Sequence, residues 1–433
     1  MSSLAAPVRQ PIEAPATSGL GLQLHVTTVQ RLLAWTDQGL VSLGNFVSTL
    51  VIARALAPSE FGIYAVVFAA VLVLNSFHAA AVIFPLSIRG PALDRTPLRE
   101  LTVAALLGTV ALAMVFVGLA YVAILTTGRL SLLPYVAATM VFWQLQETTR
   151  AAFLTHFRQR AALPGDVLSY LGQAVLLIVL SRRGRLSPET AFLIIAVTSA
   201  AAFVLQAAQL RLPTVHKVRW REFVSDAVTF GTWGVPARIS TLVGAQAFPW
   251  VLFYTHGPTA AAVFQVLSST VAFCNPVMIG TSSLVTATIA KGRDPHRFAV
   301  ARKHAFYGWA LIAPFLILVA VFPSTALRLL YGSQTAYAQH ADLLWMMAGA
   351  YTCEAIVIQA TAVIGGAGRT RSVFLVQTAG LAIAVAVGLP LAAYGGVRLA
   401  LIGYLLVQIG RASIALRTWT RIASERPQLA GVS

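Results

Sequence analysis

The sequence contains a succession of apolar stretches, each long enough to cross a lipid bilayer. A membrane-spanning helix needs about 20 predominantly apolar residues, and twelve stretches of roughly that length follow one another between residues 32 and 416. Only 10% of the residues are charged, whereas soluble proteins average about a quarter. We therefore expect an all-α polytopic membrane protein with twelve transmembrane helices, and we exclude a water-soluble globular fold.

The twelve expected spans divide into two sets of six, which predicts two six-helix bundles related by pseudo-two-fold symmetry. The first bundle covers 32–210, with spans at 32–54, 63–86, 101–125, 132–154, 163–180 and 190–210. The second covers 231–416, with spans at 231–254, 260–288, 306–330, 341–364, 372–392 and 397–416. The remaining segments are expected to be an N-terminal tail, a basic linker and a C-terminal tail, at 1–31, 211–230 and 417–433.

The distribution of cations predicts the orientation. With the N-terminus inside, 21 of the 31 Lys and Arg residues fall in inner segments and seven in outer ones. Inner loops of membrane proteins carry such an excess, so we expect both termini to be cytoplasmic. This bias accounts for the net charge of +17 without a nucleic-acid partner. One loop opposes it, because Arg182, Arg183 and Arg185 follow the short fifth span, which itself carries Ser169 and Gln173.

An internal repeat supports the two-bundle arrangement. Residues 44–75 align with 244–275 without a gap, and the identical pairs include Gly44/Gly244, Pro58/Pro258 and Asn75/Asn275. Each half thus has a helix, a turn with proline, and a second helix with an asparagine at the same depth. Two halves in the same orientation are typical of transporters that rock about a central site. The alternative is two unrelated hairpins that share only their composition.

Two segments resemble a known family. The run Asp37-Gln-Gly-Leu-Val-Ser-Leu-Gly-Asn-Phe46 leads to Ala53-Arg-Ala-Leu-Ala-Pro-Ser-Glu-Phe-Gly-Ile-Tyr-Ala65. This resembles the opening hairpin of the Wzx-like polysaccharide and O-antigen flippases of the MOP (MATE-like) exporter superfamily. Leu329-Leu-Tyr-Gly332, followed by Tyr337-Ala338, is a second similar region. The resemblance implies translocation of a lipid-linked oligosaccharide by alternating access, through a polar and often cationic cavity between the bundles.

Ionisable residues within a span are costly and usually face a cavity or a partner. Asp37 in the first span and Arg238 in the seventh lie at nearly matching positions of the repeat, with Asn45 and Gln246 about two turns further on. We expect these four side chains to face the cavity. One hypothesis is that Asp37 and Arg238 pair as a latch when the cytoplasmic side closes, leaving Arg238 for a diphosphate when that side opens. The alternative is that Arg238 extends to the interface and Asp37 caps its helix.

Further polar and charged residues lie within the expected spans, and Arg150 and His78 have two interpretations each. Arg150 is three residues from Glu147, so it either pairs with it or lines the cavity. His78 and Asn75 lie one turn apart, and His78 is expected to hydrogen-bond between helices or, alternatively, to carry protons. Glu354 is the candidate for a protonatable coupling group. Arg411 is expected to extend toward the interface.

The sequence lacks the motifs of an enzyme or an ATPase. Its histidines form no His-Glu-x-x-His pattern, its two cysteines build no metal site, and Gly365-Gly-Ala-Gly-Arg369 lacks the Lys-Ser/Thr of a phosphate loop. We therefore expect no catalytic residue, no metal and no cofactor.

The expected function is transport of a polyprenyl-diphosphate-linked oligosaccharide from the cytoplasmic to the periplasmic leaflet, for polysaccharide biosynthesis. The expected partners are that cargo, membrane lipids and polysaccharide assembly proteins. One alternative is a MATE-like, cation-coupled multidrug exporter. The other is a membrane glycan polymerase or ligase, which the short loops oppose, because such enzymes by resemblance carry a long periplasmic loop.

Overall fold

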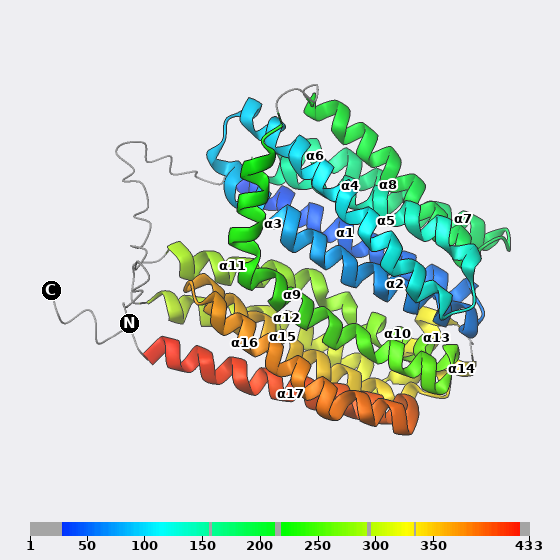
Figure 1. The fold of residues 1–433 in the computed structure, drawn as a ribbon. Coiled ribbons are helices and arrows are strands. Elements are labelled where there is room, and N and C mark those ends of the chain that lie inside the picture. The colour runs from blue at the N-terminus through cyan, green and yellow to red at the C-terminus, as the bar shows by residue number, and fades with distance from the viewer. Residues whose placement is uncertain (1–27, 156–157, 213–217, 292–295, 333–334, 425–433) are drawn as a thin grey trace, which may run out of the picture.

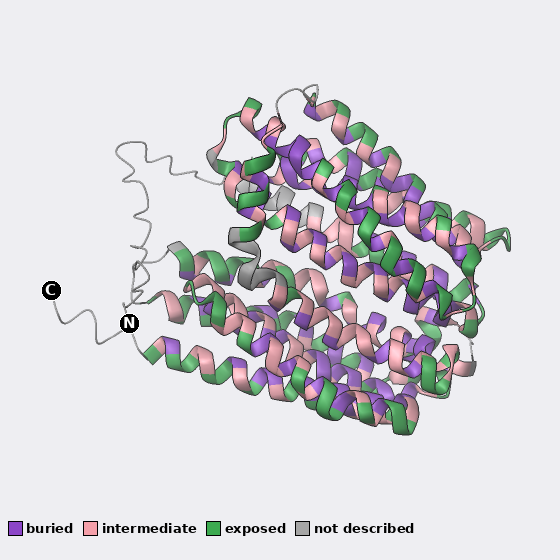
Figure 2. Ribbon diagram, viewed as in Figure 1, coloured by how far each residue is buried: buried purple, intermediate pink, exposed green. Residues whose placement is uncertain are grey.

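A computed structural model describes residues 28–155, 158–212, 218–291, 296–332 and 335–424, without the side chains of 28–37, 92, 229–235, 291 and 335. These ranges are helical apart from their connecting turns. The helices form two groups that lie side by side, the first blue to green and the second green to red (Figure 1). Buried residues fill the inside of each group, and exposed ones occupy the outward faces (Figure 2). Many of those exposed residues are large and apolar, such as Val122 at 59% and Leu318 at 56%, as a lipid-facing surface requires.

The first bundle contains six spans, some of them made of two joined helices. They are α1 (Thr28–Ala55), α2 (Pro58–His78) continued by α3 (Phe84–Arg89), α4 (Arg95–Leu125), α5 (Leu133–Thr155), α6 (Gln159–Asp166) continued by α7 (Gly172–Arg182), and α8 (Pro188–Leu210). π-Helical turns join the halves of the second and fifth spans, at Ala79–Ile83 and Val167–Leu171. The polar fifth span is thus a real helix with a local bulge, and its Ser169 is buried.

The second bundle repeats this plan. Its helices are α9 (Trp220–His256), α10 (Pro258–Val271) continued by α11 (Asn275–Lys291), α12 (Arg297–Val321), the short α13 (Pro323–Tyr331) and α14 (Thr335–Ala338), α15 (Leu344–Gly366), α16 (Thr370–Ile383) and α17 (Leu389–Ser424). The segment Thr370–Ser424 holds two spans, because its backbone leaves helical geometry at Gly395 and Gly396.

The expected twelve spans in two bundles are therefore present in the described ranges. Eight helical segments are long and apolar enough to cross a membrane by composition alone, Thr370–Ser424 among them, and the more polar α1, α5 and α9 complete the set. The ninth span was misplaced: 306–330 was expected, but α12 runs from Arg297 to Val321. Phe322 has non-helical dihedral angles, because the residue before a proline, here Pro323, is disfavoured in a helix.

The two ends of the bundles differ in charge. α1 begins and α17 ends at the same end (Figure 1), which we name the basic end because it carries Arg89, Arg158, Arg219, Arg302 and Arg421. The opposite end carries the two proline turns of the repeat.

The bundles touch each other at the opposite end. A Cβ atom on Gly62 would lie only 1.9 Å from the carbonyl oxygen of Pro258, so the first turns of α2 and α10 approach as closely as glycine allows. Arg54 Nη2 donates to the carbonyl oxygen of Leu329 at 3.2 Å. The hydroxyls of Thr126 and Tyr254 are also hydrogen-bonded. These contacts close the opposite end between the bundles.

Helix α9 belongs to both bundles. It begins at Trp220, inside the segment 211–230 expected as a linker. Arg89 of α3 bonds Asp226 at 2.7 Å and Glu222 at 3.0 Å, while Phe223 packs into the apolar core of the first bundle. Further along, Phe248 stacks 5.8 Å from Phe264 of the second bundle. α9 turns between these two regions (Figure 1), with Pro236 inside the helix.

Candidate functional site

A cavity of about 460 Å³ lies between the bundles. Most of its lining comes from α1, α2, α5 and α7 of the first bundle, and the rest from α10 and α11. Asn75 and Asn275, the pair that the repeat places at equal depth, both line it. Asn45 lines it as well, so two of the expected cavity amides are where the sequence predicted them.

A second cavity of about 510 Å³ adjoins the first. The two share Gln38, Arg150 and Ile279, and the second extends to Leu154 and Gln159 near the basic end. We call the two together the central cleft. It reaches toward the basic end, whereas the opposite end is closed by the contacts of Gly62 and Arg54.

The two walls of the cleft differ in polarity. The first bundle contributes amides, hydroxyls and the charged Glu147 and Arg150. Near the basic end the second bundle contributes α11 and α12, whose lining residues are mostly apolar, such as Leu284 and Leu311. The two hydroxyls on this wall are already used: Thr281 donates to the carbonyl of Val277, and Ser283 to that of Ile279. One wall can therefore solvate a polar group, and the other an apolar chain.

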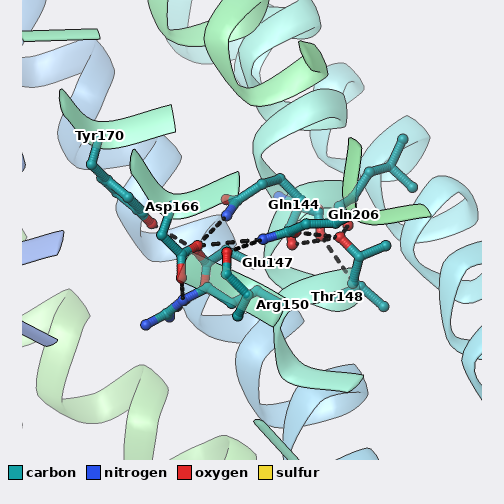
Figure 3. Close-up of polar contacts among 11 residues, drawn as sticks. Gln144, Glu147, Thr148, Arg150, Asp166, Tyr170 and Gln206 are labelled. Atoms are coloured by element: carbon teal, nitrogen blue, oxygen red, sulfur yellow. Dashed lines mark hydrogen bonds and ion pairs between the residues drawn. The ribbon is translucent and has the colours of Figure 1, made fainter. Parts of the chain in front are cut away.

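Arg150 holds together a buried network in the first bundle, which we name the Arg150 cluster (Figure 3). Its Nε donates to Asp166 at 3.1 Å and its Nη1 lies 3.5 Å from Glu147. The Tyr170 hydroxyl donates to Glu147 at 2.6 Å, and the amides of Gln146 and Gln206 donate to Asp166 at 3.2 and 3.5 Å. Both readings of Arg150 therefore apply, because it pairs with Glu147 and also lines the cleft.

Asp166 is the member of this cluster that sequence reasoning missed. Its side chain is fully buried, and a lone acid inside the span 163–180 was the available signal. The span was expected to be short and to carry polar residues, and a charge near the end of such a helix is easily taken for a loop residue.

The second bundle holds a matching network, the Arg411 cluster. Arg411 donates to Glu354 at 2.6 Å, to Gln408 at 2.7 Å and to Gln377 at 2.5 Å. Arg411 is only 5% exposed, so the expectation that it extends to the interface was wrong. Glu354 was considered alone as a coupling group, but its carboxylate is bound by this arginine, 57 residues away in the chain.

His78 connects three helices. Its Nε2 lies 3.0 Å from the Thr109 hydroxyl and 2.9 Å from that of Thr148, and the residue is fully buried. The expected helix–helix hydrogen bond is thus present. His78 is not among the residues that line the central cleft.

The remaining candidates lie apart from the cleft or cannot be placed. The side chain of Asp37 is outside the described residues, so the latch with Arg238 stays a hypothesis. Arg238 is exposed on α9 and makes no ion pair among the described side chains. Gln246 lines a different, apolar groove of about 350 Å³ between α2, α4 and α9.

Comparison with known proteins gives a result for structure but none for sequence. No family model matches the chain, and no curated protein does. Solved structures of transporters match nearly its whole length. One is a multidrug resistance MATE family transporter of the MOP superfamily in an inward-facing conformation, with a TM-score of 0.71, 14% identity, and coverage of 92% of this chain and 98% of that one.

Two further structures extend this likeness beyond multidrug transporters. A MOP superfamily transporter from Pyrococcus furiosus has a TM-score of 0.65 at 13% identity, covering 91% of this chain and 95% of that one. The lipid II flippase MurJ has a TM-score of 0.64 at 12% identity, covering 90% and 87%. The chain has the MOP transporter fold. It is a polytopic membrane protein of that fold, and the fold is the one that the resemblance of its opening hairpin implies.

Proposed function

We propose that this protein flips an amphiphile, a polyprenyl-diphosphate-linked oligosaccharide, from the cytoplasmic to the periplasmic leaflet of a bacterial inner membrane, for polysaccharide synthesis. The observation that carries the proposal is the two-sided central cleft. Its first-bundle wall offers amides and charged groups such as Arg150, and its α11–α12 wall offers apolar side chains such as Leu311. A cargo with a polar head and an apolar chain satisfies both walls at once, whereas a small polar solute leaves one unused.

The charge of the two ends supports the proposed direction of transport. The positive-inside bias assigns the basic end to the cytoplasm, and the cleft reaches toward that end while the opposite end is closed. This conformation would receive cargo from the cytoplasmic side. Rocking of the bundles would then open the opposite end by separating Gly62 from Pro258.

Arg238 is our candidate ligand for the diphosphate. Extending the 200-residue offset of the repeat relates Arg238 to Gln38, which lines both parts of the cleft. Arg238 itself does not line the cleft in this conformation, so the proposal requires it to approach the cargo as the bundles rock. It makes no ion pair among the described side chains, whereas Arg150 and Arg411 are each bound to carboxylates. A planar guanidinium that stays charged suits bidentate binding of phosphate oxygens.

A second candidate function rests on the Arg150 cluster. Two carboxylates, Glu147 and Asp166, face one arginine there, and an acidic cavity wall is what a cation-coupled exporter of organic cations needs. That function predicts that drug resistance, rather than glycan export, depends on Glu147.

The deciding experiment measures on which leaflet the lipid-linked glycan accumulates in cells that lack the gene. We expect accumulation on the cytoplasmic face, restored to normal by the wild-type gene but not by Arg238→Ala. Arg182→Ala is the matched control, because Arg182 is an exposed arginine outside the cleft, and it should restore translocation fully.

Two other outcomes would overturn the proposal. Normal translocation in the deletion strain, with altered sensitivity to cationic drugs, would support the exporter. Normal translocation with shortened or unattached glycan would instead support a polymerase or ligase.

A further inference from the structure

The first-bundle part of the cleft is rich in uncharged hydrogen-bonding groups. Amides line this cavity from five helices, Asn45 of α1, Asn75 of α2 and Gln173 of α7 in the first bundle and Gln265 of α10 and Asn275 of α11 in the second. Each amide offers two donors and an acceptor, and hydroxyls such as Ser48 add to them. Ser48 Oγ and Asn75 Oδ1 are buried without a partner among the described atoms. Buried polar atoms are normally hydrogen-bonded, so these two indicate a ligand with its own hydroxyls.

Aromatic rings line the same space in a nearly parallel array. Tyr64 and Phe68 stack at 5.5 Å with planes 12° apart, and Phe68 and Trp143 at 5.9 Å with planes 8° apart. All three line the cavity, and Trp143 is at the end of the array. A flat indole beside amide groups matches the two surfaces of a sugar ring, since the C–H face of a pyranose packs on an aromatic ring while its hydroxyls bond to polar groups.

The charges of this region leave nothing for an acidic ligand. Among the side chains that the structure describes, its charged lining residues are Glu147 and Arg150, and Arg150 is already engaged by Glu147 and by the buried Asp166. A carboxylate brought here would be desolvated without a cation of its own, which is unfavourable. An uncharged sugar pays no such penalty.

We propose that this region is a subsite for an uncharged sugar, such as a hexose or an N-acetylhexosamine, and that it discriminates against uronic acids. The inference rests on the proposed function, in that the sugar is the head of a lipid diphosphate. The cavity of about 460 Å³ falls within the usual size of small-molecule sites, about 300–1,000 Å³, so it accepts a short saccharide. The sugar binds the amides and the indole that line this cavity.

The test compares the binding of four probes to the full chain in lipid nanodiscs by calorimetry. They are farnesyl diphosphate, farnesyl diphosphate carrying N-acetylglucosamine, the same lipid carrying glucuronic acid, and free N,N′-diacetylchitobiose. We expect N-acetylglucosamine to tighten binding about tenfold relative to farnesyl diphosphate, and glucuronic acid to give no gain. Asn45→Leu and Asn75→Leu should each remove the tenfold gain, whereas Gln339→Leu should keep it.

Gln339→Leu is the control, because it makes the same kind of change at an exposed amide outside the cleft. The subsite is refuted if the glucuronyl probe binds as tightly as the N-acetylglucosaminyl probe, or if the gain survives both asparagine changes. Failure of the proposed function looks different: farnesyl diphosphate then fails to bind at all. In that case the free chitobiose alone tests the subsite. Binding that is lost in Asn45→Leu supports it, and absence of binding refutes it.

Discussion

Each bundle buries one arginine against a glutamate from its fourth span, but the two networks have different surroundings. Glu147 of α5 and Arg150 line the central cleft. Glu354 of α15 and Arg411 do not line it, and Arg411 is enclosed by the amide oxygens of Gln377 and Gln408. An Arg–Glu pair therefore borders the cleft in one bundle and is enclosed by protein in the other. The two pairs are chemically alike, and they differ in the residues that surround them.

The two clusters also differ in which helix supplies the arginine. Arg150 comes from the same helix as Glu147, so that pair forms within α5 and ties it to α6 through Asp166. Arg411 comes from α17 and reaches Glu354 on α15 and Gln377 on α16. The Arg411 cluster thus joins three helices, and its loss should affect the packing of the whole second bundle.

The largest effect on stability is expected for Arg411→Met. It leaves Glu354 without its cation in a buried site, which typically costs about 3–5 kcal/mol. Thermal unfolding in detergent should show a clear fall in Tm. Adding Glu354→Gln should restore most of it, because replacing both partners removes the unpaired charge. A single variant as stable as the double variant would contradict a structural role for the pair.

Arg150→Met should combine a loss of stability close to that of Arg411→Met with a large loss of transport. Asp166 is fully buried and loses its cation, although it keeps the donors of Gln146 and Gln206. We expect a destabilisation of about 3–5 kcal/mol, the usual cost of breaking a buried ion pair. Because Arg150 lines the cleft and Arg411 does not, transport per folded protein should fall only in Arg150→Met, and equal transport in the two variants would remove the distinction between the clusters.

Gly62→Val tests the contact between the bundles. A Cβ would meet the Pro258 carbonyl at 1.9 Å, so the opposite end cannot close and the population should shift toward the conformation open at that end. A cysteine introduced at Tyr254 should become more reactive to an impermeant maleimide added on the periplasmic side. Gly118→Val is the control, because nothing lies within 4 Å of a Cβ at that position, and it should leave the labelling unchanged.

The smallest effect is expected for His78→Met. The repeat-related position in the second bundle is a buried methionine, Met278, and Thr109 and Thr148 each keep a bond to their own helix backbone. The loss should be about 1 kcal/mol, as for a typical hydrogen bond, with transport retained. Loss of pH-dependent transport in this variant would support proton carriage by His78 instead.

Much of the fold could be read from the sequence, because a bilayer forces each crossing to be a long apolar helix. The repeat also placed Asn75 and Asn275 at one cavity, since homologous helices present the same faces. Contacts between residues that are distant in the chain could not be predicted from the sequence. Glu354 and Arg411 are 57 residues apart, and no local spacing relates α15 to α17. Arg411 was therefore taken for an interfacial residue, although it is the centre of a buried network.

The path of α9 has a consequence for how the molecule could be divided. Its first turns are fixed to the first bundle by Arg89, and its later turns pack inside the second through Phe248. If the chain were cut between Leu212 and Val218, the C-terminal fragment would still carry the peptide that docks on the N-terminal fragment. Two separately expressed halves should therefore associate in the membrane through the first turns of α9. Asp226→Arg should weaken that association.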